Sequence, residues 1–419
     1  MSKKISLALN RSFSLFLLTL SVFNSQVFAD FAYVTNNDDT VSVIDTSSNT
    51  VVATIPVGNA PQGVAVTPNG QFVYVSNGGD DNVSVIDTSS NTIVATVPVG
   101  FSPVGVAITP NGQFVYVVNN LSFSHNVSVI NTATNTVIAT VPIGTAPFGD
   151  AANPNGLFVY AANSVDNTVS VINTSTNAVV ATTAVGSGPI GVAVTPNGLF
   201  AYVTDIGDAT VSVIDTSTNA VTAIISVGTS PRGVAVTPNG QFAYVTNNGS
   251  ASISVINTSS NTVVATISSV GSSPQGIAFT PDGLLAYVVI RGDDTVITID
   301  TSTNTIVGSP IAVGLFPQEI AIREGTSLSP PNNLSGHQKK NDFGLLFERF
   351  NLLQWEASAS GSQVAGYFVY RNGVKIATLS ASTFEYEDHN RKKGVTTSYS
   401  VTAFNASNSE SPAATIQIN

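Results

Sequence analysis

Short apolar runs alternate with clusters of turn-forming residues throughout residues 31–323. In the unit that begins at Pro61, the runs GVAV, FVYV, VSVI and IVATV are separated by TPNG, NGGDD and DTSSN. Runs of this length between Gly, Pro, Asn and Asp are typical of β-strands joined by turns. The unit shows no apolar period of 3.6 residues, so the pattern predicts an all-β structure with four strands in each unit.

The four-strand unit occurs seven times. Its second strand carries a tyrosine in every copy, and consecutive tyrosines are 41–44 residues apart. These residues are Tyr33, Tyr74, Tyr116, Tyr160, Tyr202, Tyr244 and Tyr287. A repeat of about 40–45 residues that carries several short strands is the signature of a β-propeller blade.

The first and last units are incomplete in a complementary way. The chain enters the repeats at Phe31 with the second strand of a unit, and a lone first strand, residues 319–322, follows Pro317. We therefore predict that this C-terminal strand joins the N-terminal blade and closes a ring of seven blades. The alternative is an open solenoid, whose leftover half-units would expose edge strands.

The repeated segments also carry a family resemblance. The YVTN strand, the TPNG turn, the DTSSNTVVATIPVG stretch and the PQGVAV strand together resemble the YVTN β-propeller repeat proteins. That family is similar to the propeller domains of microbial surface-layer proteins. The resemblance spans residues 31–323 and implies a seven-bladed propeller at a cell surface or outside the cell, with no known ligand. The fourth unit departs from the pattern, because GDAANP replaces GVAVTP and places Asp150 on an innermost strand near the channel.

The chain after the repeats has a different pattern. Residues 326–341 are expected to form a linker, and residues 342–419 contain strand-like segments and the only tryptophan, Trp355. The stretches GYFVYRNGVKIATL and TSYSVTAFNASNSESP resemble a fibronectin type III module. This resemblance implies a small β-sandwich with Trp355 and Tyr399 in its core.

Charge is scarce and unevenly distributed. Charged residues make up 9% of the chain, against about 25% in an ordinary domain. Residues 30–325 carry 18 acids and 3 bases, a net charge of −15, whereas residues 326–419 carry 7 acids and 8 bases. An acidic propeller argues against nucleic acid and anionic membranes as partners.

The N-terminal segment predicts export. Lys3, Lys4 and Arg11 precede or flank an apolar stretch at residues 13–23, and Val-Phe-Ala at 27–29 is a small-residue cleavage pattern. We expect residues 1–29 to be a signal peptide, and the propeller to occupy residues 30–325 of a secreted, periplasmic or surface protein. An uncleaved anchor is the alternative, but the apolar stretch is shorter than the about 20 residues that span a membrane. No membrane insertion of the mature chain is expected.

Candidate catalytic groups are few. The chain has no cysteine, which excludes disulfides, thiolate metal sites and a cysteine nucleophile, and it has 3 histidines, of which only His125 lies in the repeats. No GxSxG, HExxH or phosphate-binding glycine loop occurs. The residue that opens each DTSSN-type turn alternates between Asp and Asn, which indicates turn chemistry and not a metal ligand. We therefore expect no catalytic residues, no metal site and no cofactor.

One face of the disk is the strongest functional candidate. The loops after each YVTN strand and the loops between blades share this face, and their residues vary against a constant frame, as binding loops on a scaffold do. We expect an acidic rim around a partly aromatic centre that binds a protein or glycan partner. The alternative is a solvated loop face that only keeps the molecule soluble. The candidate residues are Asp38, Asp39, Asp80, Asp81, Phe101, Phe148, Asp150, Arg232, Asp293 and Phe316.

Four further hypotheses remain open. The paired aspartates could bind calcium weakly, although their spacing matches no calcium motif. Residues 291–293 spell Arg-Gly-Asp, which suggests an adhesion role. Asp150 and Arg232 at the channel mouth could serve a propeller-type hydrolase or lactonase. Besides a binding protein and an enzyme, a structural surface-coat protein is a third functional class.

Overall fold

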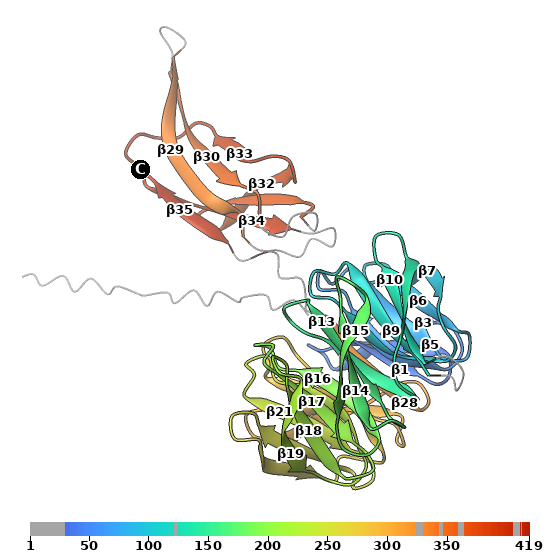
Figure 1. Cartoon of the computed structure of the whole chain (residues 1–419). Helices are drawn as coiled ribbons and strands as arrows, with labels where there is room; N and C mark the ends of the chain where they lie inside the picture. The colour runs from blue at the N-terminus through green and yellow to red at the C-terminus, as the bar shows by residue number, and fades with distance from the viewer. Residues whose placement is uncertain are drawn as a thin grey trace, which may run out of the picture. The chain divides into compact units, whose positions relative to one another are not determined.

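Strands and turns make up the described structure, a computed structural model that covers residues 30–120, 125–323, 330–342, 347–358, 364–404, 411 and 413–419 (Figure 1). The chain divides into a unit that ends at Thr326 and a unit that begins at Ser327. The signal peptide expected over residues 1–29 lies outside the described residues. No helix in the described ranges is long and apolar enough to cross a membrane.

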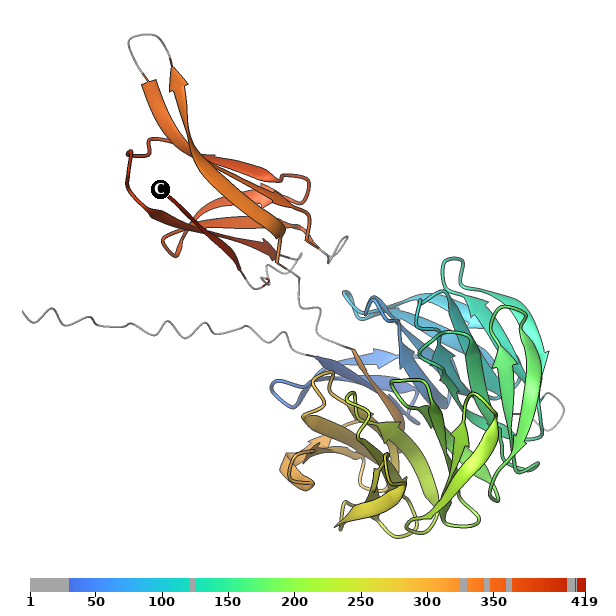
Figure 2. The same ribbon diagram turned by 60° about the vertical axis from the view of Figure 1, so that its left-hand side comes forward.

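The first unit consists of seven four-stranded antiparallel sheets, which follow one another around a ring (Figure 2). The innermost strands are β4 (Pro61–Val66), β8 (Pro103–Ile108), β12 (Pro147–Ala152), β16 (Pro189–Val194), β20 (Pro231–Val236), β24 (Pro274–Phe279) and β28 (Pro317–Arg323). The second strands are β1 (Phe31–Asn36), β5 (Phe72–Asn77), β9 (Phe114–Asn119), β13 (Phe158–Asn163), β17 (Phe200–Asp205), β21 (Phe242–Asn247) and β25 (Leu285–Ile290).

The remaining strands of each sheet lie further from the axis. The third strands are β2 (Thr40–Asp45), β6 (Asn82–Asp87), β10 (Asn126–Asn131), β14 (Thr168–Asn173), β18 (Thr210–Asp215), β22 (Ser252–Asn257) and β26 (Thr295–Asp300). The outermost strands are β3 (Thr50–Pro56), β7 (Thr92–Pro98), β11 (Thr136–Pro142), β15 (Ala178–Ala184), β19 (Ala220–Ser226), β23 (Thr262–Ser268) and β27 (Thr305–Ala312). We call the sheet β28-β1-β2-β3 blade 1 and number the following sheets as blades 2 to 7.

The ring closes as the sequence predicts. The last propeller strand, β28, pairs antiparallel with the first strand of the chain, β1, with Phe31 opposite Arg323 and Val34 opposite Ile320. Blade 1 therefore combines both ends of the repeat array, and an open solenoid is excluded. This confirms the prediction of an all-β, seven-bladed propeller.

Apolar layers between neighbouring blades form the core. In one such layer, Tyr33 and Val43 of blade 1 pack with Val64 and Val75 of blade 2, and all four are buried. Because the second and third strands have neighbours on both sides, their central residues are buried on both faces. This explains why they are continuous apolar runs without alternation.

The tyrosine of the YVTN motif links each blade to the next. The hydroxyl of Tyr74 in blade 2 donates to Oδ1 of Asn135, which ends the turn between the third and fourth strands of blade 3, at 2.8 Å. The same contact recurs around the ring, and Tyr287 in blade 7 donates to Asn49 in blade 1 at 2.5 Å. Blade 4 is the exception, because the Tyr160 hydroxyl and Oδ1 of Asn219 are buried without a partner at hydrogen-bond geometry. Contacts between blades thus explain why the tyrosine recurs in the repeats.

The other polar letters of the motif also join strands. Thr35 donates to the carbonyl of Gln62 on the next innermost strand at 2.6 Å. Asn36 donates through Nδ2 to Ser42 on the neighbouring strand at 3.0 Å. Thr and Asn therefore satisfy buried backbone and hydroxyl groups that the apolar core cannot satisfy.

The tyrosine contact predicts a graded effect of Tyr-to-Phe substitutions. Tyr74→Phe leaves Oδ1 of the half-buried Asn135 without its donor, so we expect a loss of about 1 kcal/mol in the free energy of unfolding. Tyr160→Phe removes a hydroxyl that makes no hydrogen bond to Asn219 and lies near Asn153 and Thr216 without good hydrogen-bond geometry, so we expect a smaller loss. Denaturant unfolding of the two variants measures the difference. Equal losses for both would contradict the role assigned to the contact.

Asp205 stands where five other blades have the asparagine of the motif. Its side chain is buried and accepts hydrogen bonds from Ser212 at 2.8 Å and Thr210 at 3.1 Å. Burial raises the pKa of Asp205 from 3.8 to about 6, and these hydroxyl donors only partly oppose the shift. The folded state therefore holds the proton more tightly than the unfolded chain does.

This shift predicts that Asp205→Asn stabilises the propeller above pH 6. The wild type loses stability as pH rises from 3.8, and the loss is complete once pH exceeds the folded pKa of about 6. The amide does not ionise, so we expect a gain of about 1–2 kcal/mol at pH 7 and little gain at pH 4. Unfolding midpoints of both proteins at the two pH values test this. A gain of equal size at both would show that ionisation is not its cause.

The second unit is a small β-sandwich of two sheets. One sheet has the order β29-β30-β33 and the other β32-β31-β34-β35. The strands are β29 (Asn332–Asp342), β30 (Phe347–Glu356), β31 (Gly366–Arg371), β32 (Val374–Ser380), β33 (Glu385–Asp388), β34 (Thr397–Phe404) and β35 (Ala414–Ile418). Trp355 and Tyr399 are buried in its core with Leu353, Tyr367 and Val369, as predicted.

The expected linker over residues 326–341 is wrong for most of its length. Strand β29 begins at Asn332 and pairs with β30. Its sequence, NNLSGHQKKND, has one aliphatic residue and none of its residues is buried. The alternation by which a strand is recognised from sequence is therefore absent.

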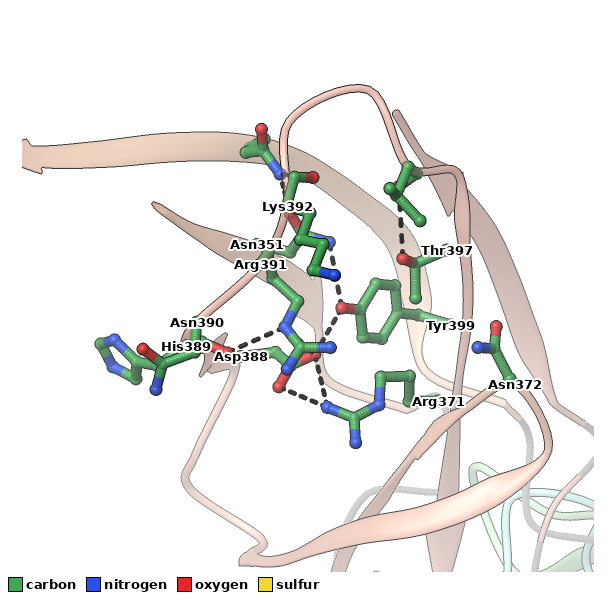
Figure 3. Close-up of polar contacts among 12 residues, drawn as sticks. Asn351, Arg371, Asn372, Asp388, His389, Asn390, Arg391, Lys392, Thr397 and Tyr399 are labelled. Carbon is green, nitrogen blue, oxygen red and sulfur yellow. Dashed lines mark hydrogen bonds and ion pairs between the residues drawn. The ribbon is translucent and has the colours of Figure 1, made fainter. Parts of the chain in front are cut away.

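A polar cluster ties the two sheets of the sandwich together (Figure 3). Asp388, at the end of β33, is buried, and its carboxylate receives Arg371 of β31 at 2.9 and 3.1 Å. The Tyr399 hydroxyl, on β34, donates to the same carboxylate at 2.5 Å and accepts from Nδ2 of Asn351 at 3.0 Å. The partners of this carboxylate are side chains of the sandwich itself. The cluster is therefore explained by its role in joining the two sheets.

Candidate functional site

The wall of the channel at the propeller axis is built on glycine. Six innermost strands have glycine two positions after their first proline, namely Gly63, Gly105, Gly149, Gly191, Gly233 and Gly276. A Cβ at Gly63 would overlap the carbonyl oxygen of Val104 on the next innermost strand. Glycine thus permits a close approach of neighbouring backbones. The wall varies mainly at the residue between the proline and the glycine.

The varying residues divide the channel mouth into two arcs. The innermost strands neighbour one another around the ring in chain order, and β28 neighbours β4. The polar arc occupies four consecutive strands and consists of Arg232, Gln275, Gln318 and Gln62. The apolar arc occupies the other three and consists of Val104, Phe148 and Ile190. Together they line one cavity of about 230 Å³.

Arg232 lies where the two arcs meet. Its Nη1 donates to Oε1 of Gln275 at 2.8 Å, and its guanidinium carbon lies 5.7 Å from the centre of the Phe148 ring. The side chain therefore leans past Ile190 of the intervening strand. Burial lowers the pKa of Arg232, and Arg291 adds to the effect, but a guanidinium remains charged at any ordinary pH. The site thus holds a permanent, partly desolvated cation.

Glu319 is a site residue that the sequence reasoning missed. It takes the place of the wall glycine on β28, and its Oε1 lies directly against Gly276, where a Cβ would overlap it. Burial of the carboxyl raises its pKa from 4.5 to about 7, although the Arg232 charge opposes the shift. The signal was available, because Glu319 is the one departure from the glycine column of the repeats.

Asp150 lies in the channel wall and not at its opening. It replaces the valine that follows the wall glycine, and its Oδ1 faces Gly105 on the neighbouring strand, 2.6 Å from where a Cβ would stand. Both carboxyl oxygens are buried, and although the backbone N–H groups of Asp150 and Ala107 lie near, none makes a hydrogen bond of good geometry to them. Burial raises the pKa of Asp150 well above its usual value, while the backbone N–H groups of Asp150 and Ala107 oppose the shift. No hydrogen bond or ion pair among the described residues joins Arg232 to Asp150 or Glu319.

The aspartates of the predicted acidic rim have structural contacts. Asp80 accepts from the backbone N–H of Asn59 at 2.8 Å and from its side-chain amide at 2.7 Å. The other rim aspartates likewise accept a backbone N–H of an inter-blade loop, with Asp38 bound by Leu315, Asp39 by Ala60, Asp81 by Ser102, and Asp293 by Ser272. These carboxylates hold the inter-blade loops in place. Their recurrence is therefore explained without a partner.

His125 occupies the same structural position as Asp39 and Asp81. The backbone N–H of Ala146 donates to its Nδ1 at 3.3 Å. His125 therefore holds an inter-blade loop as those aspartates do. The turn-opening Asp and Asn residues behave as predicted, since Oδ1 of Asp45 accepts the N–H groups of Ser47 and Ser48 at 2.8 and 3.3 Å.

Two aromatic side chains project from the inter-blade loops. Phe101 and Phe316 are 54% and 49% exposed. Phe316 has a φ of 48°, a left-handed conformation that is strained for a bulky residue. The Arg291 guanidinium lies 5.4 Å from its ring centre. Both charged side chains of the Arg-Gly-Asp sequence are thus engaged, Arg291 by Phe316 and Asp293 by Ser272.

No group of three or more metal-ligating side chains gathers anywhere in the described part of the chain. The paired aspartates of the loops are divided between different backbone donors, as described above. The site that the structure brings together is therefore the channel mouth and its wall, which unite Phe148, Asp150 and Arg232 of the predicted residues with Glu319 and three glutamines.

Comparisons with solved structures agree with the propeller architecture. A functionally unknown protein from Desulfotomaculum acetoxidans is 21% identical with a TM-score of 0.62, over 70% of this chain and 99% of that one. Kuenenia stuttgartiensis hydrazine synthase is 22% identical with a TM-score of 0.56, over 62% and 88% of the two chains. Dihydro-heme d1 dehydrogenase NirN in complex with DHE is 16% identical with a TM-score of 0.54, over 73% and 77%. At these identities the likeness concerns the fold alone.

Comparisons of sequence identify the family. A search of curated proteins finds no match. A family model described as YNCE-like beta-propeller matches residues 19–318, which is most of the chain. The chain belongs to the family of YNCE-like β-propellers.

Proposed function

We propose that the chain is an exported binding protein that recognises a protein or glycan partner through the propeller face onto which the inter-blade loops open, with the channel mouth at the centre of recognition. The observation that carries the proposal is the contrast within the innermost strands. Proline and glycine recur at fixed positions, while the residue between them is polar in some blades and apolar in others. A constant frame with variable, converging side chains is typical of a binding site.

The contacts of the loops favour the channel mouth over the acidic rim as the proposed site. The rim aspartates are engaged by backbone donors, whereas Arg232 and Phe148 line an open cavity. Phe101 and Phe316 add exposed apolar surface on the same loops. A partner would thus contact aromatic loop tips and insert a group into the mouth.

The remaining parts of the proposal rest on the sequence and on the second unit. Export is supported by the predicted signal peptide over residues 1–29. A fibronectin type III-like identity of the second unit is supported by its division into three-stranded and four-stranded sheets and by the buried Trp355 and Tyr399. We propose that this sandwich acts as a spacer or a second contact.

A hydrolase or lactonase remains the second candidate because of one observation. Glu319 is a buried carboxyl whose pKa is about 7, as a general base at neutral pH requires. The described residues near it supply no side chain paired with it as a nucleophile. Turnover of ester, lactone or glycoside substrates that disappears in Glu319→Gln would favour this candidate.

Binding of the full mature chain to arrays of defined glycans and purified envelope proteins tests the main proposal. The variants are Arg232→Ala and Phe148→Ala at the mouth, and Asp80→Asn at the rim. Gln241→Ala is the matched control, because Gln241 lies in blade 6 like Arg232 but in the exposed turn after β20, at the other end of that strand. We expect partner binding that the mouth variants lose and the control keeps. No binding that depends on the mouth would overturn the proposal.

A further inference from the structure

The two arcs of the channel mouth carry information about the chemistry of the ligand. Polar and apolar residues are not mixed around the ring, because Arg232, Gln275, Gln318 and Gln62 are consecutive and so are Val104, Phe148 and Ile190. A ligand held by both arcs has a polar edge on one side and an apolar face on the other.

The charge of the mouth defines the polar edge. Among the described residues, the five N–H donors of Arg232 have one hydrogen-bond acceptor, Oε1 of Gln275, which is neutral. The carboxyls nearest to it make no ion pair with it in the described structure. A desolvated guanidinium whose partner is neutral favours a carboxylate, which it can bind with two parallel hydrogen bonds. The three glutamine side chains supply further donors and acceptors.

The apolar arc defines the opposite side. Phe148 presents a ring next to the guanidinium, and Val104 and Ile190 flank it on the neighbouring strands. A flat or compact ring that lies on Phe148 would place a carboxylate substituent beside Arg232. The cavity volume of about 230 Å³ lies below the about 300–1,000 Å³ of sites for drug-sized molecules, so the ligand is compact.

Building on the proposed function, we propose that the channel mouth binds a compact carboxylate carried on an apolar ring, with the carboxylate on Arg232 and the ring on Phe148. The group can be a free molecule or the end group of a larger partner. Its chemistry is the same in both cases, and the proposal concerns that group.

Glu319 gives this site a dependence on pH. Glu319 follows Gln318 on β28. The charged groups around its carboxyl are Arg232 of β20 and Asp150 in the wall of the same cavity, and the charge of Arg291 acts on Arg232. When Glu319 is ionised, its negative charge offsets the positive charge of Arg232 and repels an anionic ligand. When it is protonated the mouth is more positive. Carboxylate binding is therefore expected to weaken as pH rises through about 7, where burial places the Glu319 pKa.

Calorimetric titration of the full mature chain with benzoate, benzamide and acetate tests the proposal. Benzoate carries both features, benzamide lacks the charge, and acetate lacks the ring. We expect benzoate to bind at least about tenfold more tightly than either, a difference of about 1.4 kcal/mol. Arg232→Gln should remove the preference for benzoate over benzamide, and Phe148→Ala the preference over acetate. Glu319→Gln should keep benzoate binding and remove its weakening between pH 6 and pH 8.

The outcomes separate this inference from the function on which it rests. Equal affinity for benzoate and benzamide, or no effect of Arg232→Gln in a folded variant, overturns the carboxylate assignment. If partner binding on the arrays still depends on Phe148 and Arg232, the proposed function stands and only the ligand class is wrong. If no array partner depends on the mouth either, both fail. Arg232→Lys keeps the charge and serves as a second variant should Arg232→Gln unfold.

Discussion

A chain that ends at residue 316 is expected to lose the folded propeller, whereas a chain that ends at residue 326 is expected to keep it. The shorter chain lacks β28, so blade 1 has three strands and β1 exposes its backbone donors and acceptors along the channel. Ile320, which packs in the layer between blades 7 and 1 with Ala32 and Val34, is lost as well. An unprotected edge strand without charged residues, as β1 (FAYVTN) would then be, is also an aggregation site.

The measurement is a comparison of the two truncated proteins by size-exclusion chromatography and thermal unfolding. The longer chain lacks only the second unit and serves as the matched control. We expect a cooperative, monomeric transition for the longer chain, and aggregation or the absence of a transition for the shorter one. A stable monomer that ends at residue 316 would show that ring closure does not hold the blades together.

Asp150→Val is expected to stabilise the propeller by about 1–3 kcal/mol at pH 7. The equivalent residues Val64 and Ile277 are buried in the layers between blades. Asp150 places a carboxyl in the same environment, where only the nearby backbone N–H groups of Asp150 and Ala107 compensate part of the cost of its burial. Valine restores the apolar contact and removes a buried polar group.

The pH dependence distinguishes this effect from simple packing. Because burial raises the folded pKa of Asp150 well above 3.8, wild-type stability falls as pH rises from that value through the raised pKa. Asp150→Val removes this component, so its advantage over the wild type grows with pH. Asp150→Asn is the control, since it removes the charge but keeps a polar group. Denaturant unfolding between pH 4 and pH 8 gives the comparison, and a destabilised Asp150→Val would show that the carboxyl has a stabilising partner.

The repeats made the propeller predictable. Seven copies of one unit show each strand several times, and the complementary first and last units indicate how the ring closes. The turn-opening residues could be interpreted because Asp and Asn alternate at one position, which excludes a requirement for charge.

The role of the rim aspartates could not be read from the sequence. Asp80 contacts Asn59 and Asp293 contacts Ser272, in each case across 21 residues and between two different loops. These contacts depend on how the loops lie beside each other, which no local pattern specifies. Exposed acidic pairs in variable loops therefore suggested a binding surface where the structure shows loop anchors.

The two arcs of the mouth could be recognised only in the closed ring. Gln318 and Gln62 are at opposite ends of the repeat array, and closure makes β28 and β4 neighbours. Glu319 was visible as a departure from glycine, but only the structure shows that its carboxyl is buried beside the channel. Strand β29 was missed for a different reason, because it has no apolar face.

The most direct test of recognition at the channel mouth is a paired affinity measurement with any partner that the mature chain binds. One arm is Arg232→Gln at the mouth, and the other is the double variant Asp80→Asn and Asp81→Asn at the rim. We predict that the mouth variant weakens binding by at least about tenfold, which is about 1.4 kcal/mol, while the rim variant retains the wild-type affinity. Loss of binding in the rim variant, with wild-type affinity in the mouth variant, would contradict recognition at the channel mouth and would indicate that the acidic loops form the site.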